Sequence, residues 1–164
     1  MVRGLDCQTG QVLGSRPIQS WVASPGLTVA ELAVSPEGRT GYRSMFGTDL
    51  VAVEISGDGL ALRSGPVGFG AGELTRDPLL QRLYQTDFFQ DALRVIDSRT
   101  LEVIEQIPLE CTPRPVAVAP GRDLIAVGEW TDGIVHFLRR STGERLDTTI
   151  PVGEYLREIA IDDD

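Results

Sequence analysis

A repeat of about 42 residues runs along this chain and constrains its fold more than any other feature. Thr100-Leu101-Glu102 and Thr142-Gly143-Glu144 lie 42 residues apart, and Asp58-Gly59-Leu60 lies 42 residues before the first of them. A second pair, Ile107-Pro108-Leu109 and Ile150-Pro151-Val152, is separated by 43 residues. A constant period indicates one structural unit that is copied along the chain and that buries its apolar faces against its neighbours.

Each period contains short apolar runs separated by turn residues, which is the pattern of strands. Val116-Ala-Val-Ala is followed by the turn Pro120–Asp123, and further runs begin at Leu124, Ile134 and Leu146. The chain's 18 glycines and 10 prolines favour many turns. Four short strands per period are typical of the blades of a β-propeller. The fold class that we predict is all-β: a β-propeller segment with about three complete four-stranded antiparallel blades and flanking partial blades.

The predicted domain is a single incomplete propeller over residues 1–164. Its complete blades span about 29–68, 72–110 and 114–153, and partial blade strands lie in 1–28 and 154–164, including a last strand at Glu158–Ile161. These strands do not close a ring. The chain is therefore either part of a larger propeller or a unit that pairs its open blade edges with another copy, since an unpaired edge is a template for association.

Three stretches carry a family resemblance. They are Pro115-Val-Ala-Val-Ala-Pro-Gly-Arg-Asp-Leu, Leu93-Arg-Val-Ile-Asp-Ser-Arg-Thr, and Ala33-Val-Ser-Pro-Glu-Gly. They resemble the YVTN-type β-propeller repeats, which are related to WD-repeat and lactonase-like propellers. The resemblance implies the fold and leaves the function open, because propellers host unrelated activities.

Composition excludes several classes of function. With 24 acidic against 15 basic residues the net charge is −9, which argues against binding to nucleic acid. No apolar run approaches the roughly 20 residues of a membrane-spanning helix. Cys7 and Cys111 are too few for a disulfide framework or a four-ligand zinc site; two free thiols or one disulfide remain the alternatives. We expect no cofactor, and the cellular location stays open.

The start of each innermost strand is where a propeller brings side chains to its central channel. The predicted binding residues at these positions are Glu31, Glu73, Arg114, Arg157 and Glu158. Equivalent glutamates could form an acidic collar that binds a cation such as calcium. In the simpler interpretation they are solvated and partly paired with the arginines, and the metal therefore stays unknown.

The turns between second and third strands open on the same face. Asp87-Phe-Phe-Gln-Asp91 and Trp130-Thr-Asp132 place aromatic side chains there, either for contact with a partner or as filling between blades. His136 is the only histidine, and its alternation with Val135 and Phe137 favours a structural side chain.

The function that we predict is a non-catalytic propeller platform that binds a protein or small-molecule ligand at the channel face. The alternative is part of a propeller enzyme, either lactonase-like or a redox subunit similar to amine-dehydrogenase propellers. Expected partners exclude nucleic acid and membranes, and self-association through open blade edges is a further expectation.

The register also predicts a core and a set of turns. Residues expected to be buried between blades are Val34, Leu83, Val95, Ile107, Val116, Val118, Ile125 and Ile159. Thr9-Gly10, Asp58-Gly59, Thr100-Leu101 and Thr142-Gly143 are expected in equivalent hairpin turns. Leu101 stands where the three other copies have glycine, which predicts a different turn type there.

Overall fold

The fold is built almost wholly from strands. In a computed structural model the described residues are 2–5, 9, 11–16, 32–44, 49–56, 59–68 and 70–162. Within these ranges the one helical element is a 3-10 turn at Pro120–Arg122, and none of the elements is a helix that could cross a membrane. The prediction of an all-β fold is confirmed.

Three four-stranded antiparallel sheets make up most of the chain, and in each of them the spatial order of the strands follows the sequence. The first sheet contains β3 (Leu32–Val34), β4 (Thr40–Ser44), β5 (Asp49–Ser56) and β6 (Gly59–Pro66). The second contains β7 (Ala71–Asp77), β8 (Arg82–Asp87), β9 (Ala92–Asp97) and β10 (Val103–Pro108). The third contains β11 (Pro113–Ala119), β12 (Leu124–Glu129), β13 (Ile134–Arg139) and β14 (Arg145–Pro151).

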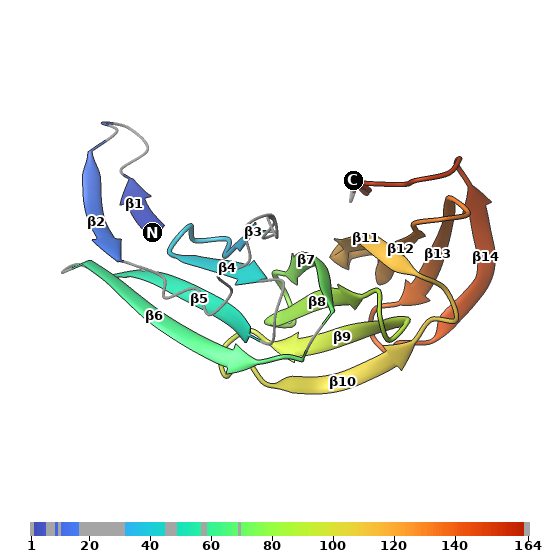
Figure 1. Cartoon of the computed structure of the whole chain (residues 1–164), viewed down its shortest axis with the longest axis horizontal. Coiled ribbons are helices and arrows are strands. Elements are labelled where there is room, and N and C mark those ends of the chain that lie inside the picture. The colour runs from blue at the N-terminus through green and yellow to red at the C-terminus, as the bar shows by residue number, and fades with distance from the viewer. Residues whose placement is uncertain are drawn as a thin grey trace.

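The sheets follow one another along an open arc. Figure 1 shows β3, β7 and β11 on its inner side and β6, β10 and β14 on its outer side. A two-stranded sheet of β1 (Val2–Leu5) and β2 (Val12–Arg16) lies beyond the first sheet. This arrangement confirms three complete blades with a partial blade beside them.

Apolar side chains fill both interfaces between the sheets. Leu50, Leu83 and Ile96 are fully buried in the cluster between the first and second sheets. Leu93 and Ile125 are equally buried in the cluster between the second and third. A single four-stranded sheet has two apolar faces, and stacking the sheets removes these faces from water.

The predicted core is confirmed at most positions. Leu83, Val95, Val116 and Ile125 are buried, and Ile107 and Val118 pack partly buried against the second cluster, while Ile159 is half-buried. The prediction for Val34 is wrong, because its side chain is 52% exposed. Side chains alternate along a strand, and Ala33 and Ser35 take the buried face, so Val34 points to the other face of the first sheet.

The predicted strand Glu158–Ile161 does not form. The chain after β14 instead crosses the third sheet near the β12–β13 turn, where the amides of Val152 and Tyr155 donate to the carbonyls of Gly133 and Trp130 at 2.8 and 2.9 Å. A strand requires a backbone partner along its length. This segment bonds to a turn, so it does not extend the sheet pattern.

In the second and third sheets the turns between third and fourth strands are equivalent, as predicted for Thr100-Leu101 and Thr142-Gly143. The amide of Leu101 donates to the carbonyl of Asp97 at 2.8 Å, and that of Gly143 donates to Arg139 at 2.7 Å. The expectation of a different turn type at Leu101 is wrong. Leu101 has a φ of 64°, close to the 73° of Gly143, although it carries a side chain. The prediction for Gly59 is wrong, because Gly59 is the first residue of β6, pairs with Ser56 and has a φ of 138°. Gly10 and Asp58 lie outside the described residues.

Candidate functional site

The inner strands β7 and β11 begin with matching irregularities. In β7 the pairing with β8 shifts between Ala71 and Leu74, and in β11 the pairing with β12 shifts between Pro113 and Val116. Two residues in each strand therefore bulge at the same height of neighbouring blades. Glu73 and Arg114 belong to these two bulges, which are equivalent parts of the repeat.

A buried hydroxyl joins the two bulges. Thr86 Oγ1 donates to the carbonyl of Arg114 at 2.7 Å and accepts from the amide of Glu73 at 2.9 Å. Its side chain is fully buried. The structure therefore brings the backbones of Glu73 and Arg114 together through one residue of β8.

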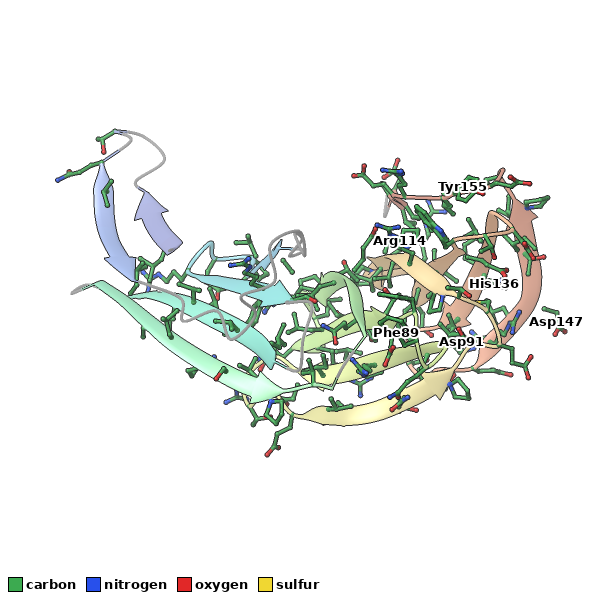
Figure 2. All side chains as sticks on the ribbon, in the orientation of Figure 1. Phe89, Asp91, Arg114, His136, Asp147 and Tyr155 are labelled. Carbon is green, nitrogen blue, oxygen red and sulfur yellow. The ribbon has the colours of Figure 1, made fainter. Side chains whose placement is uncertain are left out.

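An aromatic and arginine cluster lies at the same end of the third sheet. The guanidinium carbon of Arg114 lies 4.0 Å from the centre of the Trp130 ring, and that of Arg157 lies 5.6 Å from it. The Tyr155 ring meets Trp130 edge-on, with centroids 5.6 Å apart, and is 60% exposed. Figure 2 shows Arg114 and Tyr155 near the C-terminal end of the arc. We call Arg114, Trp130, Tyr155 and Arg157 the Trp130 cluster.

The Trp130 cluster differs from the predicted collar. Arg114 and Arg157 converge on the indole ring of Trp130, where the ring quadrupole gives the face a negative electrostatic potential that attracts cations. Glu158 is exposed beside Arg157 in the sequence, and Glu31 lies outside the described residues. Tyr155 was missed by sequence reasoning, because it follows the last strand and no periodic signal marks it.

The neighbouring β8–β9 turn on the same face is held by contacts of Asp87. Asp87 Oδ1 accepts from the amides of Phe89 and Gln90 at 3.0 and 3.1 Å, and its carboxylate also pairs with the buried Arg94. Burial lowers the pKa of Arg94, while Asp87 opposes that effect. The turn projects Phe89, which is 57% exposed with its ring 4.2 Å from that of Phe88.

A cleft of about 400 Å³ lies at the opposite ends of the strands, between the first and second sheets. Arg63, Arg76 and Arg99 line it together with Glu37 and Glu54. Two guanidinium nitrogens of Arg76, Nε and Nη1, are buried without a hydrogen-bond partner. Sequence reasoning missed this cleft because its residues come from four separated stretches.

Stacked four-stranded antiparallel sheets around an arc, with the inner strands starting at a common face, define a β-propeller segment. Comparison with solved structures supports this class. Kuenenia stuttgartiensis hydrazine synthase is similar over 85% of this chain with a TM-score of 0.67 and 17% identity. Hsv2 from Kluyveromyces marxianus is similar over 74% (TM-score 0.54, 9% identity), and Hsv2 from Kluyveromyces lactis over 75% (TM-score 0.54, 11% identity).

These likenesses concern the fold alone. The chain spans 40% of the hydrazine synthase chain and 38% and 37% of the two Hsv2 chains. No protein family and no curated protein matches the sequence. Hydrazine synthase is an enzyme by name and Hsv2 is not, yet both share this architecture. The architecture therefore does not decide between catalysis and binding.

Proposed function

We propose that this chain is part of a YVTN-type propeller and serves as a non-catalytic platform that binds a protein partner at the Trp130 cluster. The observation that supports this proposal is the convergence of two arginines and a tyrosine on one tryptophan at the channel-side end of the third sheet. The repeat motifs of the sequence support the YVTN assignment.

The composition of the Trp130 cluster suits protein recognition. Tryptophan, tyrosine and arginine are the residues that most often dominate binding energy at interfaces. The arginines already lie over the ring in the absence of a partner, which reduces the side-chain conformational entropy that is lost on binding. Their guanidinium edges can still donate to carboxylates, so a partner segment that combines an acidic and an apolar side chain fits this surface.

Peptide selection tests the proposal. A library of random peptides is selected on the wild-type chain, and the affinity of enriched peptides is measured by fluorescence anisotropy. We expect W130A and R114A to weaken binding at least tenfold. Arg122→Ala is the matched control, because it removes an exposed arginine from the opposite end of the same sheet. Enriched peptides that bind W130A and wild type equally would overturn the proposal, provided that thermal unfolding shows both proteins folded.

Self-association through open blade edges stays a separate prediction. The exposed Val34 lies on a face of the first sheet that points away from the first apolar cluster. Sedimentation velocity across a concentration series measures the state of the chain, and V34D is expected to shift it toward the monomer. A wild-type chain that is monomeric at all concentrations would contradict this expectation.

A further inference from the structure

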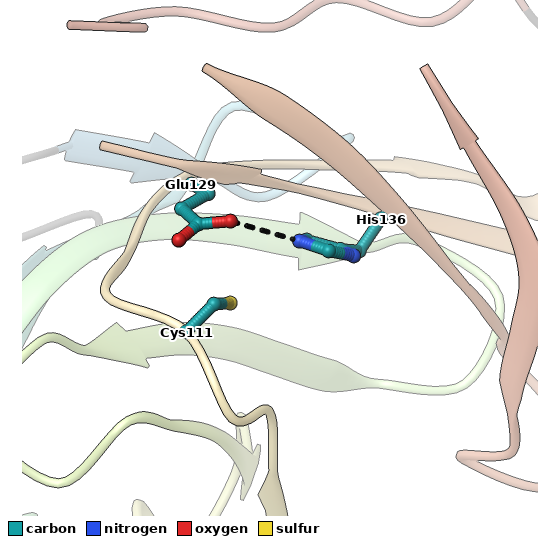
Figure 3. Close-up of side chains that lie close together, drawn as sticks. All are labelled: Cys111, Glu129 and His136. Atoms are coloured by element: carbon teal, nitrogen blue, oxygen red, sulfur yellow. Dashed lines mark hydrogen bonds and ion pairs between the residues drawn. The ribbon is translucent and has the colours of Figure 1, made fainter. Parts of the chain in front are cut away.

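Three side chains with metal-binding atoms converge inside the third sheet. Cys111 precedes β11, Glu129 ends β12 and His136 lies in β13 (Figure 3). One ligand atom from each lies within 4.8 Å of the other two, and Cys111 and His136 are buried. Thiol, carboxylate and imidazole are the three ligand types that zinc takes in proteins.

The spacing is close to that of a tetrahedral centre. Zinc–ligand bonds of about 2.0–2.3 Å place neighbouring ligand atoms roughly 3.3–3.8 Å apart. Glu129 Oε2 and His136 Nε2 are already 3.3 Å apart. The sulfur of Cys111 has to approach them by roughly 1.3 Å at most to complete three corners, and water can take the fourth.

Arg145 controls which imidazole nitrogen is available. Its Nη2 lies 2.9 Å from His136 Nδ1, and a guanidinium can only donate, so Nδ1 is the acceptor and Nε2 carries the proton that faces Glu129. A metal bound at Nε2 replaces that proton, and the neutral ring then carries its proton on Nδ1. Two donors would face each other, so Arg145 must turn away.

Arg145 has other partners for its guanidinium. Its Nη1 donates to the carbonyl of Leu109 at 2.9 Å and lies 3.6 Å from the carboxylate of Glu110, and its side chain is 37% exposed. It can therefore release His136 without becoming an unpaired buried charge.

We propose that Cys111, Glu129 and His136 form a binding site for a divalent cation of the zinc class, and that Arg145 blocks the site in the metal-free chain. In the bound state the thiolate and the carboxylate balance the two charges of the cation. The thiol proton is released to solvent, and the imidazole proton moves from Nε2 to Nδ1.

Cobalt(II) is the probe for this site, because its bond to a thiolate gives a near-ultraviolet charge-transfer band and a four-coordinate site gives strong visible bands. We expect both bands on titration of the wild-type chain and their loss on addition of zinc. C111S removes the charge-transfer band and H136Q weakens binding at least tenfold. C7S is the matched control and retains the full signal, since Cys7 is the one other cysteine.

Arg145→Gln separates a metal site from a purely structural hydrogen-bonded cluster. Glutamine removes a positive charge, and its amide oxygen can accept from the Nδ1 proton of a metal-bound imidazole. We expect R145Q to bind cobalt at least tenfold more tightly than wild type. Absence of the charge-transfer band in both wild type and R145Q, or a band that C7S removes and C111S keeps, would overturn the proposal. Circular dichroism of each variant establishes that it is folded.

Discussion

Aspartates placed ten residues apart set the turns of the second sheet. Asp77, Asp87 and Asp97 end β7, β8 and β9, and Oδ1 of each accepts from the amides two and three residues later. The residue four positions after each aspartate has a positive φ: Gln81, Asp91 and Leu101, at 54°, 48° and 64°. The carboxylate thus fixes a backbone conformation that glycine otherwise supplies.

Leu101 shows why this conformation was not predicted. Its side chain is 1% exposed in the first apolar cluster, so burial outweighs the cost of a positive φ. Sequence rules assign glycine to such positions because they weigh the backbone alone. The competing gain from packing depends on a neighbouring sheet, and the local sequence does not contain it.

A glycine variant is usually less stable than the alanine variant at the same position, and we expect this order to be reversed at Leu101. L101A loses core packing and keeps the unfavourable φ, so we expect a loss of about 2–5 kcal/mol in the free energy of unfolding. L101G loses the same packing but relieves the backbone, and we expect it to be at least as stable as L101A. Leu138, which is fully buried in β13 without a positive φ, is the control: L138G should be less stable than L138A. Urea unfolding measures all four, and L101G well below L101A would contradict the prediction.

Asp97 should make stability depend on acid pH. The amide of Thr100 is the main cause that lowers the pKa of this carboxyl, and the amide of Arg99 adds to it. A lowered pKa means that the ionised form is favoured in the folded chain, so its contribution is complete above the unfolded pKa of about 3.9 and is lost as the pH falls through the folded value.

The matching experiment compares wild type with D97N by urea unfolding at several pH values. We expect the difference in unfolding free energy to be constant near pH 6 and to shrink below about pH 4 as the wild-type carboxyl is protonated. A difference that is the same at pH 6 and pH 3 would show that the charge of Asp97 does not contribute.

At the level of elements, the sequence predicts strands where one face decides their pattern. β12 is an apolar run between turn residues, and the run that begins at Leu124 was predicted as a strand. The prediction that Val34 is buried is wrong because its three-residue strand is too short for the alternation to identify the buried face. The strand predicted at 158–161 does not form, because apolar alternation allows a segment to pair but does not supply a partner strand.

The candidate site was predictable in part for a similar reason. The repeat identified the strand starts that hold Glu73 and Arg114, since copies of one unit place equivalent residues at equivalent heights, but it did not predict the bulges there. It could not identify the stacking on Trp130 or the contact with Tyr155, which depend on how the chain returns after β14. Nor could it bring Cys111 and His136 together, since Cys111 lies before β11 and His136 lies in β13, at no regular spacing.

An ion pair between elements of different sheets should be important for stability. Arg140 lies 2.8 Å from the fully buried carboxylate of Asp77, which comes from the second sheet while Arg140 follows β13 of the third. R140M leaves that carboxylate buried without its charge partner, and we expect a loss of about 3–5 kcal/mol in the free energy of unfolding.

The double variant R140M/D77N distinguishes a lost charge pair from lost packing. The amide oxygen of asparagine can still accept from the amides of Leu79 and Leu80, so the turn is kept while the buried charge is removed. We expect the double variant to be more stable than R140M alone in urea unfolding. Equal stabilities would mean that Asp77 does not carry an uncompensated charge in R140M.

At the scale of the whole molecule, each sheet depends on what covers its faces. The second sheet is covered on both faces by its neighbours, whereas the third has the second sheet on one face. Leu156 and Ile159 of the segment after β14 pack near Gly128 of β12. This segment covers part of the third sheet, and it also places Tyr155 and Arg157 beside Trp130. Its position therefore couples blade stability to the proposed binding surface.

Gly128→Ala tests this coupling. A β-carbon at residue 128 would lie 2.5 Å from a methyl group of Leu156 and 2.5 Å from the ring of Pro115, so the segment has to move away. We expect hydrogen exchange to become faster over residues 155–161, and peptide binding at the Trp130 cluster to weaken because Tyr155 and Arg157 lose their places. Backbone amides of β8 and β9 are the internal reference and should exchange at unchanged rates, since both strands lie in the second sheet. Faster exchange throughout all three sheets would instead show that residue 128 supports the whole fold and that the segment has no separate role.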